Sequence, residues 1–554
     1  MNDCCAPRAD RTYDLSVIGA GSAGFSAAIT AAGEGAKVAL IGAGTIGGTC
    51  VNVGCVPSKT MIRAAEAVHG TYRAGRFPGL AGEAHVSDWR ALIAAKDDLV
   101  GTLRQKKYID LLPEYDGVAY LEGAARLSDS GGGACVLVDG SPISTGKIII
   151  ATGTSPAIPS IPGMERVPYL TSTTALELRE QPRSLLVIGG GYIGCELAQM
   201  FARLGTRVTL VTRSRLLPEA ESEIAEALTG YLANEGIAIR TGLSYSGIEQ
   251  QDGEVTLTID VDGRAETLTA EKVLVTTGRV PNTTGLGLSE GGVELNHNGG
   301  VVVDDRMRTS REGVYAAGDV TGRDQFVYMA AYGAKLAAKN ALNGDRLTYD
   351  NTVMPWVVFT DPQVAGVGLS ENQAVERGFE AKTSVAPLDQ VPRALAARDT
   401  RGLIKLVADA KSDRFLGAQI LAPEGADSIQ TMVLAIKYGM TTKELGETIF
   451  PYLTTVEGLK LAAQGFDKDV AKLSSAYIKA ISGISSPRDT GSVCLIEERS
   501  HRHDPHQTPH RPDRYRVRYR HPGRVGGDAV VRGYVGLSSA VGQPVVRAVR
   551  LAGL

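Results

Sequence analysis

A glycine-rich turn between an apolar run and a helical stretch occurs twice in this sequence, and this repeat restricts the fold more than any other feature. Residues 19–24 read GAGSAG and residues 189–194 read GGGYIG. An apolar run precedes each turn, and another follows the helical stretch, at 37–41 and at 207–212. The order strand, glycine-rich turn, helix and strand is typical of a dinucleotide-binding unit.

Each turn predicts a pyrophosphate site, because the free N–H groups and the dipole of a helix N-terminus favour an anion. The two turns begin 170 residues apart, at Gly19 and Gly189. A chain that binds two dinucleotides is most simply a flavoprotein that also takes NADH or NADPH. The sequence therefore predicts an α/β fold with two Rossmann-like dinucleotide-binding domains. Residues 350–470 have no such turn and predict a third, separate α/β domain.

The charge balance and the cysteine content exclude several classes of protein. The 554 residues carry 58 Lys and Arg against 61 Asp and Glu, a formal net charge of −3, which argues against a general nucleic-acid or membrane-surface binder. We find no apolar run long enough to predict a membrane span, and no apolar signal segment at the N-terminus. Seven cysteines are too few, and odd in number, for a secreted disulfide scaffold. We therefore expect a cytoplasmic protein in which any disulfide is catalytic.

The motif with the most chemical content is the run 47–59, GGTCVNVGCVPSK. Its two cysteines, Cys50 and Cys55, stand five residues apart at the start of an apparent helix, directly after the first dinucleotide unit. A helix N-terminus lowers the pKa of a thiol and makes a thiolate available. The run therefore predicts a reactive thiol pair; the alternative is a pair of buried structural cysteines.

These features together resemble one family. The cysteine run, both glycine-rich turns and the segment Tyr315–Asp319 are similar to the pyridine-nucleotide disulfide oxidoreductases, such as glutathione reductase, lipoamide dehydrogenase and mercuric reductase, over about residues 12–472. The resemblance implies FAD at the first turn and a redox-active pair, Cys50 and Cys55, beside the flavin. It makes Cys55 the inner, charge-transfer thiolate and Cys50 the outer, interchange sulfur.

The same resemblance implies further site residues. Lys59 would lie near the flavin N5 and pair with Glu196. Tyr192 would gate the nicotinamide pocket, and Asp319 would bind the ribityl chain of the flavin. The implied FAD contacts are Gly19, Gly21, Ser22, Ala23, Gly24, Gly48, Thr49, Lys59, Thr152, Gly153 and Asp319. The implied NADPH contacts are Gly189, Gly191, Tyr192, Gly194, Arg213, Arg215 and Gly278. One departure is Gly42, which stands where the family usually has an acidic residue for the adenosine ribose.

The resemblance also implies a domain plan with a C-terminal α/β dimerisation domain, and hence a homodimer. The expected parts are a flexible arm at 1–11 that contains Cys4 and Cys5, an FAD domain at 12–160 and 281–348, an NADPH domain at 161–280, the dimerisation domain at 349–473, and an extension at 474–554. From His501 onward the chain is rich in Arg and His and has no Lys. We interpret this extension as disordered; the alternative is a metal-binding tail.

The end of the second strand of the NADPH unit favours NADPH over NADH. NAD-preferring sites place a carboxylate there to bond the ribose 2′-OH. Here the strand continues into Thr212-Arg213-Ser214-Arg215, with two arginines and no carboxylate. Arg213 and Arg215 could clamp a 2′-phosphate. The alternative is that both arginines are solvated surface residues.

The residue at position 452 predicts the substrate. Disulfide reductases of the family carry a His-Pro-Thr-x-x-Glu segment, whose His protonates the leaving thiolate, whereas this chain has Tyr452 at the His position before Glu457. A phenol with a pKa near 10 is a poor general acid or base at neutral pH. Exchange with an organic disulfide should therefore be slow, since Glu457 serves in the family to orient the missing His.

The same region is similar to the mercuric reductases, as are the cysteine run and Val391-Pro392-Arg393-Ala394. Hg²⁺ is soft and prefers thiolates. The resemblance therefore implies NADPH-dependent reduction of Hg(II), delivered as thiol complexes, to Hg(0), with Cys50 and Cys55 as metal ligands and Tyr452 steering the complex. The alternatives are that Tyr452 only packs at an interface, that the chain is a glutathione- or lipoamide-type reductase, or that it binds mercury without turnover.

Two departures concern delivery of the metal. Mercuric reductases of this type end in a vicinal cysteine pair shortly after a Lys-Leu-Ser run, but residues 472–476 read KLSSA, and the only later cysteine is Cys494. A frameshift or fusion that replaced the terminus is our hypothesis, and it would impair metal delivery. Cys4 and Cys5 could bind a soft ion instead, although adjacent cysteines on such an arm are more often incidental.

Overall fold

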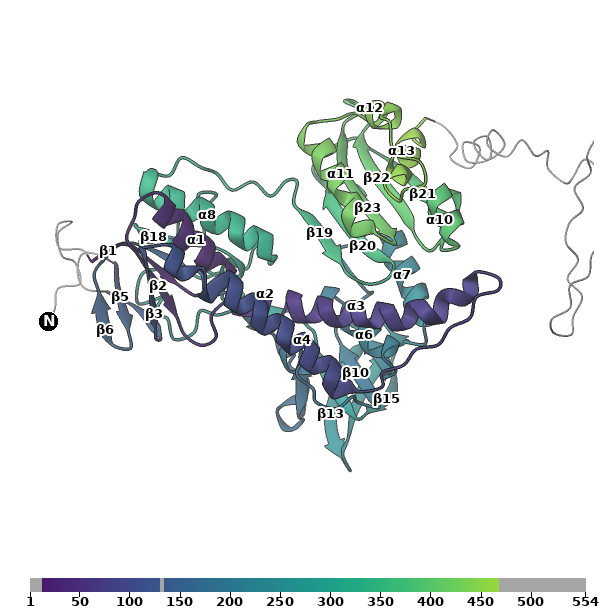
Figure 1. The fold of residues 1–554 in the computed structure, drawn as a ribbon, viewed down its shortest axis with the longest axis horizontal. Helices are drawn as coiled ribbons and strands as arrows, with labels where there is room; N and C mark the ends of the chain where they lie inside the picture. The colour runs from purple at the N-terminus through teal and green to yellow at the C-terminus, as the bar shows by residue number, and fades with distance from the viewer. Residues whose placement is uncertain (1–11, 130–133, 468–554) are drawn as a thin grey trace, which may run out of the picture. The chain divides into compact units, whose positions relative to one another are not determined.

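The computed structural model describes residues 12–129 and 134–467 (Figure 1). The arm with Cys4 and Cys5, the extension from residue 474 and its Cys494 lie outside the described residues, so the predictions made for them stay predictions.

The first glycine-rich turn belongs to a five-stranded parallel sheet of order β18-β7-β1-β2-β3. Its strands are β1 (Tyr13–Ile18), β2 (Val38–Gly42), β3 (Val118–Glu122), β7 (Thr145–Ile150) and β18 (Val314–Ala316). Helices α1 (Ser22–Gly33) and α8 (Val327–Asn343) pack against each other and against one face. The small antiparallel sheet β4 (Ala125–Asp129), β5 (Ala134–Val138) and β6 (Ser141–Ile143) shares a core with the other face. Since both faces are covered, β2 and β18 contain no polar side chain other than the Tyr315 phenol, and β7 ends in Ile148–Ile150.

The second glycine-rich turn belongs to another parallel sheet, of order β12-β11-β10-β16-β9. Its strands are β9 (Tyr169–Thr171), β10 (Ser184–Ile188), β11 (Arg207–Val211), β12 (Ala238–Arg240) and β16 (Lys272–Val275). Helices α6 (Tyr192–Arg203) and α7 (Ser222–Asn234) share its core. An antiparallel sheet of β13 (Ser244–Gln251), β14 (Glu254–Val261) and β15 (Arg264–Ala270) packs on the other side. The predicted pair of Rossmann-like units is confirmed.

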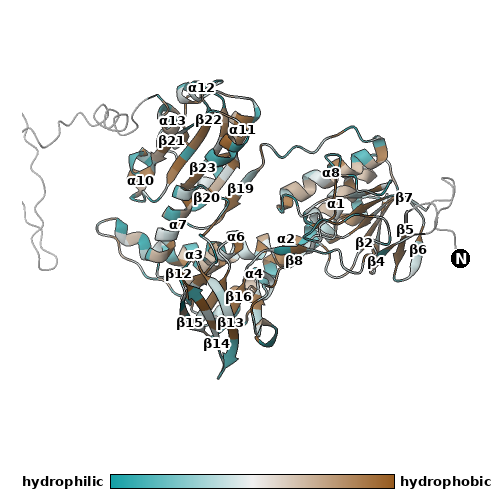
Figure 2. Ribbon diagram, turned by 180° about the vertical axis from the view of Figure 1, so that it is seen from behind, coloured by the Kyte–Doolittle hydropathy of each residue, from teal (hydrophilic) through white to brown (hydrophobic). Residues whose placement is uncertain are grey.

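The third sheet is antiparallel, of order β19-β20-β23-β22-β21. Its strands are β19 (Pro355–Val358), β20 (Gln363–Gly368), β21 (Ala381–Pro387), β22 (Leu403–Asp409) and β23 (Phe415–Ala422). Helices α11 (Gly425–Lys437), α12 (Thr442–Glu447) and α13 (Glu457–Gln464) complete its core. Figure 2 shows much of β22 and β23 in brown, as expected for central strands.

The cysteine run differs from the single helix start that the sequence predicted. Cys50 lies in the short helix α2 (Gly48–Asn52), and Cys55 is the first residue of α3 (Cys55–Tyr72). Gly54 separates them, and a Cβ there would stand 2.9 Å from the carbonyl oxygen of Thr49. The backbone therefore folds back between the two cysteines, which brings both thiols to the same side of the turn. Helix α3 then packs along α6.

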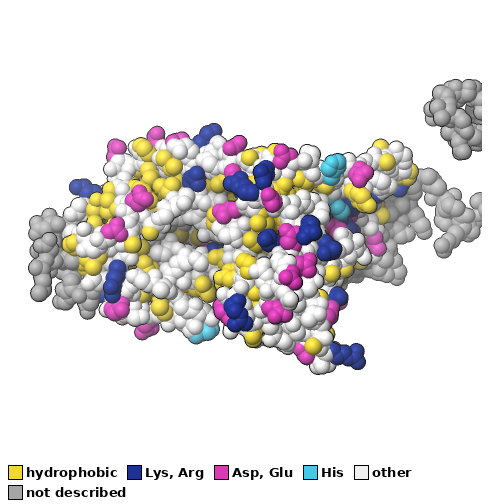
Figure 3. Space-filling view, turned by 90° about the horizontal axis from the view of Figure 1, so that it is seen from below, with side chains coloured by type: hydrophobic (Ala, Val, Ile, Leu, Met, Phe, Trp, Pro, Cys, Tyr) yellow, Lys and Arg dark blue, Asp and Glu magenta, His cyan; other side chains and the backbone are white. Residues whose placement is uncertain are grey.

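Shorter elements join the sheets. They are α4 (Trp89–Arg104), α5 (Ser172–Ala175), α9 (Glu371–Glu376), α10 (Pro392–Ala397) and the antiparallel pair β8 (Thr154–Pro156) and β17 (Arg279–Pro281). Within residues 12–129 and 134–467, every helix is too short or too polar to cross a membrane. On the face shown in Figure 3, acidic and basic side chains are interspersed rather than gathered by sign.

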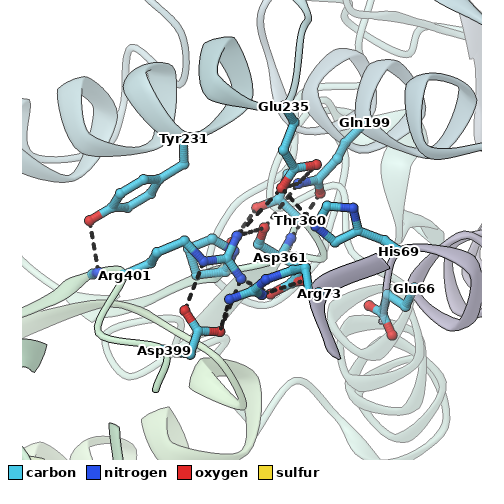
Figure 4. A network of polar contacts seen from close by, with 12 residues as sticks. Glu66, His69, Arg73, Gln199, Tyr231, Glu235, Thr360, Asp361, Asp399 and Arg401 are labelled. Carbon is cyan, nitrogen blue, oxygen red and sulfur yellow. Dashed lines mark hydrogen bonds and ion pairs between the residues drawn. The ribbon is translucent and has the colours of Figure 1, made fainter. Parts of the chain in front are cut away.

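A network of charged side chains fixes the far end of α3, five turns from Cys55 (Figure 4). Arg73, which follows α3, pairs with Asp399 at 2.9 Å, and Arg401 pairs with the same carboxylate at 2.8 Å. Arg401 also pairs with Asp361 at 2.9 Å. Arg203, at the end of α6, pairs with Asp361 at 3.0 Å and with Glu235. The network thus joins α3, α6 and the third sheet.

The histidine in this network predicts acid lability. Burial and the nearby Arg203 lower the pKa of His69 to about 4. An unfolded histidine takes up a proton below about pH 6.5, but folded His69 does not do so until about pH 4. Stability from His69 is therefore complete above pH 6.5 and falls as the pH drops toward 4, by up to about 3 kcal/mol. We expect His69→Gln to flatten this part of the pH dependence of urea unfolding, and His297→Gln, at an exposed site, to leave it unchanged.

Candidate active site

A cavity of about 1310 Å³ brings both glycine-rich turns together with the thiol pair. The site residues predicted from sequence that line it are Gly19, Gly21, Ser22, Ala23, Gly48, Thr49, Cys50, Cys55, Lys59, Thr152, Gly153, Gly189, Gly191, Tyr192, Glu196, Arg213, Gly278 and Asp319. Five described residues of the prediction are not among those that line it: Gly24, Gly194, Arg215, Tyr452 and Glu457. The individual roles of all these residues stay predictions.

The first turn is shaped for a close approach by a ligand. Gly19 has a φ of +117°, and a Cβ there would lie 2.3 Å from the carbonyl oxygen of Ala151. Gly24 does not line the cavity because it packs the helix on the turn: its Cβ would stand 1.7 Å from the carbonyl oxygen of Gly19. Among the described residues, no side chain caps α1 at Gly21. The N–H groups of its first turn therefore remain for an anion, which fits the pyrophosphate of FAD.

Gly42 explains the missing acidic residue in steric terms. A Cβ at Gly42 would lie 2.7 Å from the hydroxyl oxygen of Tyr120, on the neighbouring strand β3. A carboxylate side chain therefore does not fit at this strand end. The strand end thus offers no carboxylate to a ribose, while the glycine-rich turn beside it is intact.

The second turn repeats the first. Gly189 has a φ of +116°, and a Cβ at Gly194 would stand 1.9 Å from its carbonyl oxygen. Arg213 is exposed at the edge of the cavity, where Ser214 and Tyr245 also lie. Arg215 instead donates from Nη2 to the carbonyl oxygens of Pro218, at 2.9 Å, and Ala220, at 2.6 Å. The structure thus brings one of the two predicted arginines to the cavity.

The two thiols differ in acidity. A hydrogen bond from the Cys50 thiol and the nearby Lys59 ammonium outweigh burial and together lower the pKa of Cys55 to about 7. Cys50 has a raised pKa, because it donates to Cys55 and is buried. Cys55 is therefore the more acidic thiol of the pair, and Cys50 is the one that keeps its proton.

Lys59 is held by a carboxylate from the second dinucleotide unit, as the resemblance implied. Its Nζ lies 2.6 Å from Oε2 of Glu196, whose side chain is buried in α6. The backbone N–H of Phe359 donates to the other oxygen, Oε1, at 2.9 Å. The Lys59 ammonium also lies 4.9 Å from the centre of the Phe359 ring. Three segments far apart in sequence thus fix one positive charge beside the thiolate.

An aromatic wall next to Tyr192 was missed from sequence. Tyr192 stacks on Trp356, with ring centres 5.6 Å apart, and lies 6.1 Å from Phe326. Phe326 in turn stacks on Tyr328 at 5.4 Å. These residues follow no fingerprint, and only tertiary packing joins them. Burial here raises the pKa of Tyr192, which keeps its phenol neutral.

Asp319 lines the same cavity. Thr154 donates to its Oδ2 at 3.1 Å, and burial raises its pKa. Arg279, which follows the predicted Gly278, donates to both the hydroxyl and the carbonyl oxygen of Thr154 at 2.7 Å. Arg279 was not among the residues predicted from sequence. Its guanidinium supports the threonine that holds the aspartate.

Two dinucleotide sites that share one cavity with a thiol pair define a flavin-linked dithiol oxidoreductase. The chain belongs to the pyridine nucleotide-disulphide oxidoreductase family, whose sequence profile matches residues 13–338, while the profile of its dimerisation domain matches residues 354–463. Membership in this family confirms the predicted fold class and the predicted cofactors, FAD and NADPH.

The relatives make the resemblance more specific. The chain is 48% identical over 466 residues to a mercuric reductase of Staphylococcus aureus, covering 84% of each chain. It is 46% identical over 464 residues to a mercuric reductase of Streptomyces lividans, covering 83% of this chain and 98% of that one. Among solved structures, the HOCl-induced flavoprotein disulfide reductase RclA of Escherichia coli matches with a TM-score of 0.72 and 30% identity, over 82% of this chain and 99% of that one.

Proposed function

We propose that this protein is an NADPH-dependent flavoenzyme that reduces Hg(II) to Hg(0) at Cys50 and Cys55, and that it works as a homodimer. The observation that carries the proposal is the shared cavity, which Cys50 and Cys55 line together with both glycine-rich turns. The mercuric reductases to which the chain is similar support Hg(II) as the substrate. The dimerisation domain supports the homodimer.

Different residues of the chain would bind the cofactors and stabilise the thiolate. Gly19 and Gly189 shape the turns that would hold the pyrophosphates of FAD and NADPH. When bound, the two cofactors supply electron pairs to the thiol pair. Lys59, fixed by Glu196, keeps a positive charge beside the Cys55 thiolate.

The exchange of thiolate ligands on Hg(II) needs no histidine as a proton donor. The Cys55 thiolate displaces one thiolate from a complex Hg(SR)₂, and the Cys50 thiol displaces the second, which leaves as RSH with the proton from Cys50. The metal is then held by two cysteine sulfurs, and two electrons release Hg(0) and two thiolates. A disulfide substrate would instead need a general acid for its leaving thiolate, and a phenol such as that of Tyr452 is weak in this role at neutral pH.

Tyr452 lies in the dimerisation domain and does not line the cavity of its own chain. Its side chain is 45% exposed. We therefore assign it to the cavity of the second copy, where it would steer the incoming Hg(II)–thiol complex.

The test is Hg(II)-dependent NADPH oxidation by the purified, FAD-loaded protein under excess thiol, with glutathione disulfide and lipoamide as parallel substrates. We expect oxidation with Hg(II) alone. Oxidation with a disulfide instead would contradict the proposal and assign the chain to the disulfide reductases. Stoichiometric binding of Hg(II) without turnover would favour the alternative of a mercury-binding protein.

The choice of coenzyme gives a second test. Arg213 lies at the cavity edge. A charge-assisted hydrogen bond from its guanidinium to a 2′-phosphate contributes about 1.5–3 kcal/mol. Arg213→Ala should therefore raise the KM for NADPH by about tenfold or more and change the KM for NADH little. Arg207→Ala, at the exposed start of β11, is the matched control and should change neither. Equal losses with both coenzymes would contradict the role of Arg213.

A further inference from the structure

Glu457 has no histidine to orient, and yet its side chain is buried. In the disulfide reductases this glutamate serves the histidine that Tyr452 replaces here. Its side chain is only 6% exposed, and it is the first residue of α13. A helix N-terminus favours a negative charge, which eases this burial. A buried carboxylate still needs hydrogen-bond donors, so its present partner indicates its present role.

That partner is the backbone next to Tyr452. The N–H of Leu453 donates to Oε2 of Glu457 at 3.1 Å. Leu453 has a φ of +63°, a left-handed conformation that is strained for a non-glycine residue. The Glu457 carboxylate therefore binds Leu453, and the strained backbone of Leu453 turns the chain directly after Tyr452. Strain of this kind persists only where surrounding contacts enforce it.

Further hydrogen bonds stabilise the same turn. Thr454 donates from its hydroxyl to the carbonyl oxygen of Pro451 at 2.8 Å. The hydroxyl of Thr455 donates to Oε2 of Glu424 at 2.9 Å, and Arg393 lies 3.4 Å from Glu424. Arg393 belongs to the Val391–Ala394 run that was noted in the sequence without a role. Two glutamates thus hold the loop at Leu453 and Thr455, both shortly after Tyr452.

We propose that Glu457 is a positioning residue for Tyr452. By accepting the N–H of Leu453, it holds the left-handed turn that presents the half-exposed phenol for the Hg(II)–thiol complex. In this role the glutamate needs only an acceptor oxygen, and its proton takes no part. The inference rests on the proposed function, because it assigns Glu457 to the same substrate.

Two substitutions test whether Glu457 acts as a hydrogen-bond acceptor or as an acid. Glu457→Gln keeps an oxygen that can accept the N–H of Leu453, whereas Glu457→Ala removes it. We expect the Gln variant to keep kcat/KM for Hg(II) within about twofold and to keep the pH profile of the parent. We expect the Ala variant to lose about threefold to tenfold, the range of one hydrogen bond. A Gln variant as impaired as Ala, or with a shifted pH profile, would overturn the inference.

A double-mutant cycle excludes a merely structural role. If Glu457 acts through Tyr452, then Glu457→Ala should have no further effect on Hg(II) turnover in a Tyr452→Ala background. An equal loss in both backgrounds would overturn the inference. NADPH-dependent reduction of a dye acceptor by each variant reports whether its cofactor sites are still folded. Glu447→Ala, at the exposed end of α12, is the matched control.

The two proposals fail in different ways. Absence of Hg(II) turnover in the unmodified protein would overturn the proposed function, and the inference with it. Normal turnover with additive effects of the two alanine substitutions would overturn the inference alone.

Discussion

Replacing Cys55 by serine should abolish Hg(II)-dependent NADPH oxidation, with a loss in kcat/KM of about a thousandfold or more, the scale seen when the central group of a catalytic unit is removed. Cys55 is the more acidic thiol, with a pKa lowered to about 7, so it supplies the thiolate at neutral pH. A serine hydroxyl stays protonated there and is a hard ligand, whereas Hg²⁺ prefers soft sulfur. Steady-state NADPH oxidation at several Hg(II) concentrations measures the effect.

The remaining cysteines supply the controls. Cys195 is buried in α6 and donates to the carbonyl oxygen of Gly190 at 3.5 Å. It does not line the cavity. Cys195→Ala should therefore retain turnover, while Cys50→Ser should resemble Cys55→Ser because both sulfurs are needed to hold the metal. Full turnover in Cys55→Ser would show that the reaction does not pass through this pair.

Local patterns explain what could be predicted of the fold. The strands β1 (Tyr13–Ile18) and β10 (Ser184–Ile188) lie where the sequence predicted them, because each is a short apolar run that ends at a glycine-rich turn. The antiparallel sheets that contain β5 and β14 were missed. Their strands pair with neighbours along the chain and follow no fingerprint, and β14 alternates buried with half-buried residues instead of forming a continuous apolar run.

The site divides in the same way. The contact between Lys59 and Glu196 spans 137 residues and was available only through the family resemblance. Trp356 and Arg279 could not be found, because packing alone places them beside Tyr192 and Thr154. Arg215 satisfied the charge argument as well as Arg213 did, yet its guanidinium is used to fasten the chain after β11. Two arginines near a strand end thus predict an anionic ligand, but the sequence does not tell which arginine is free to bind it. The hydrogen bonds of each side chain in the folded chain decide that.

The charged network at the far end of α3 depends on one buried cation. The side chain of Arg203 is 3% exposed and donates from Nε and Nη2 to the two oxygens of Glu235, at 2.7 and 2.6 Å. It also pairs with Asp361 at 3.0 Å. Gln199, one turn earlier on α6, accepts from the N–H of Asp361 at 2.8 Å. Arg203 therefore joins the second dinucleotide unit to the segment whose Phe359 N–H holds Glu196.

Arg203→Met should lower the apparent free energy of unfolding by up to about 3–5 kcal/mol, because Glu235 loses both hydrogen bonds from the guanidinium and keeps only one arginine pair, with Arg401 at 3.4 Å. Urea unfolding followed by fluorescence measures the loss. Arg240→Met is the matched control: its pair with Glu266 at 3.2 Å is exposed and should contribute no more than about 1 kcal/mol. Equal effects of the two substitutions would mean that the buried network adds no more than a surface pair. A large loss for Arg203→Met alone would show that the helix that begins with Cys55 is anchored at its far end by this arginine and its partners.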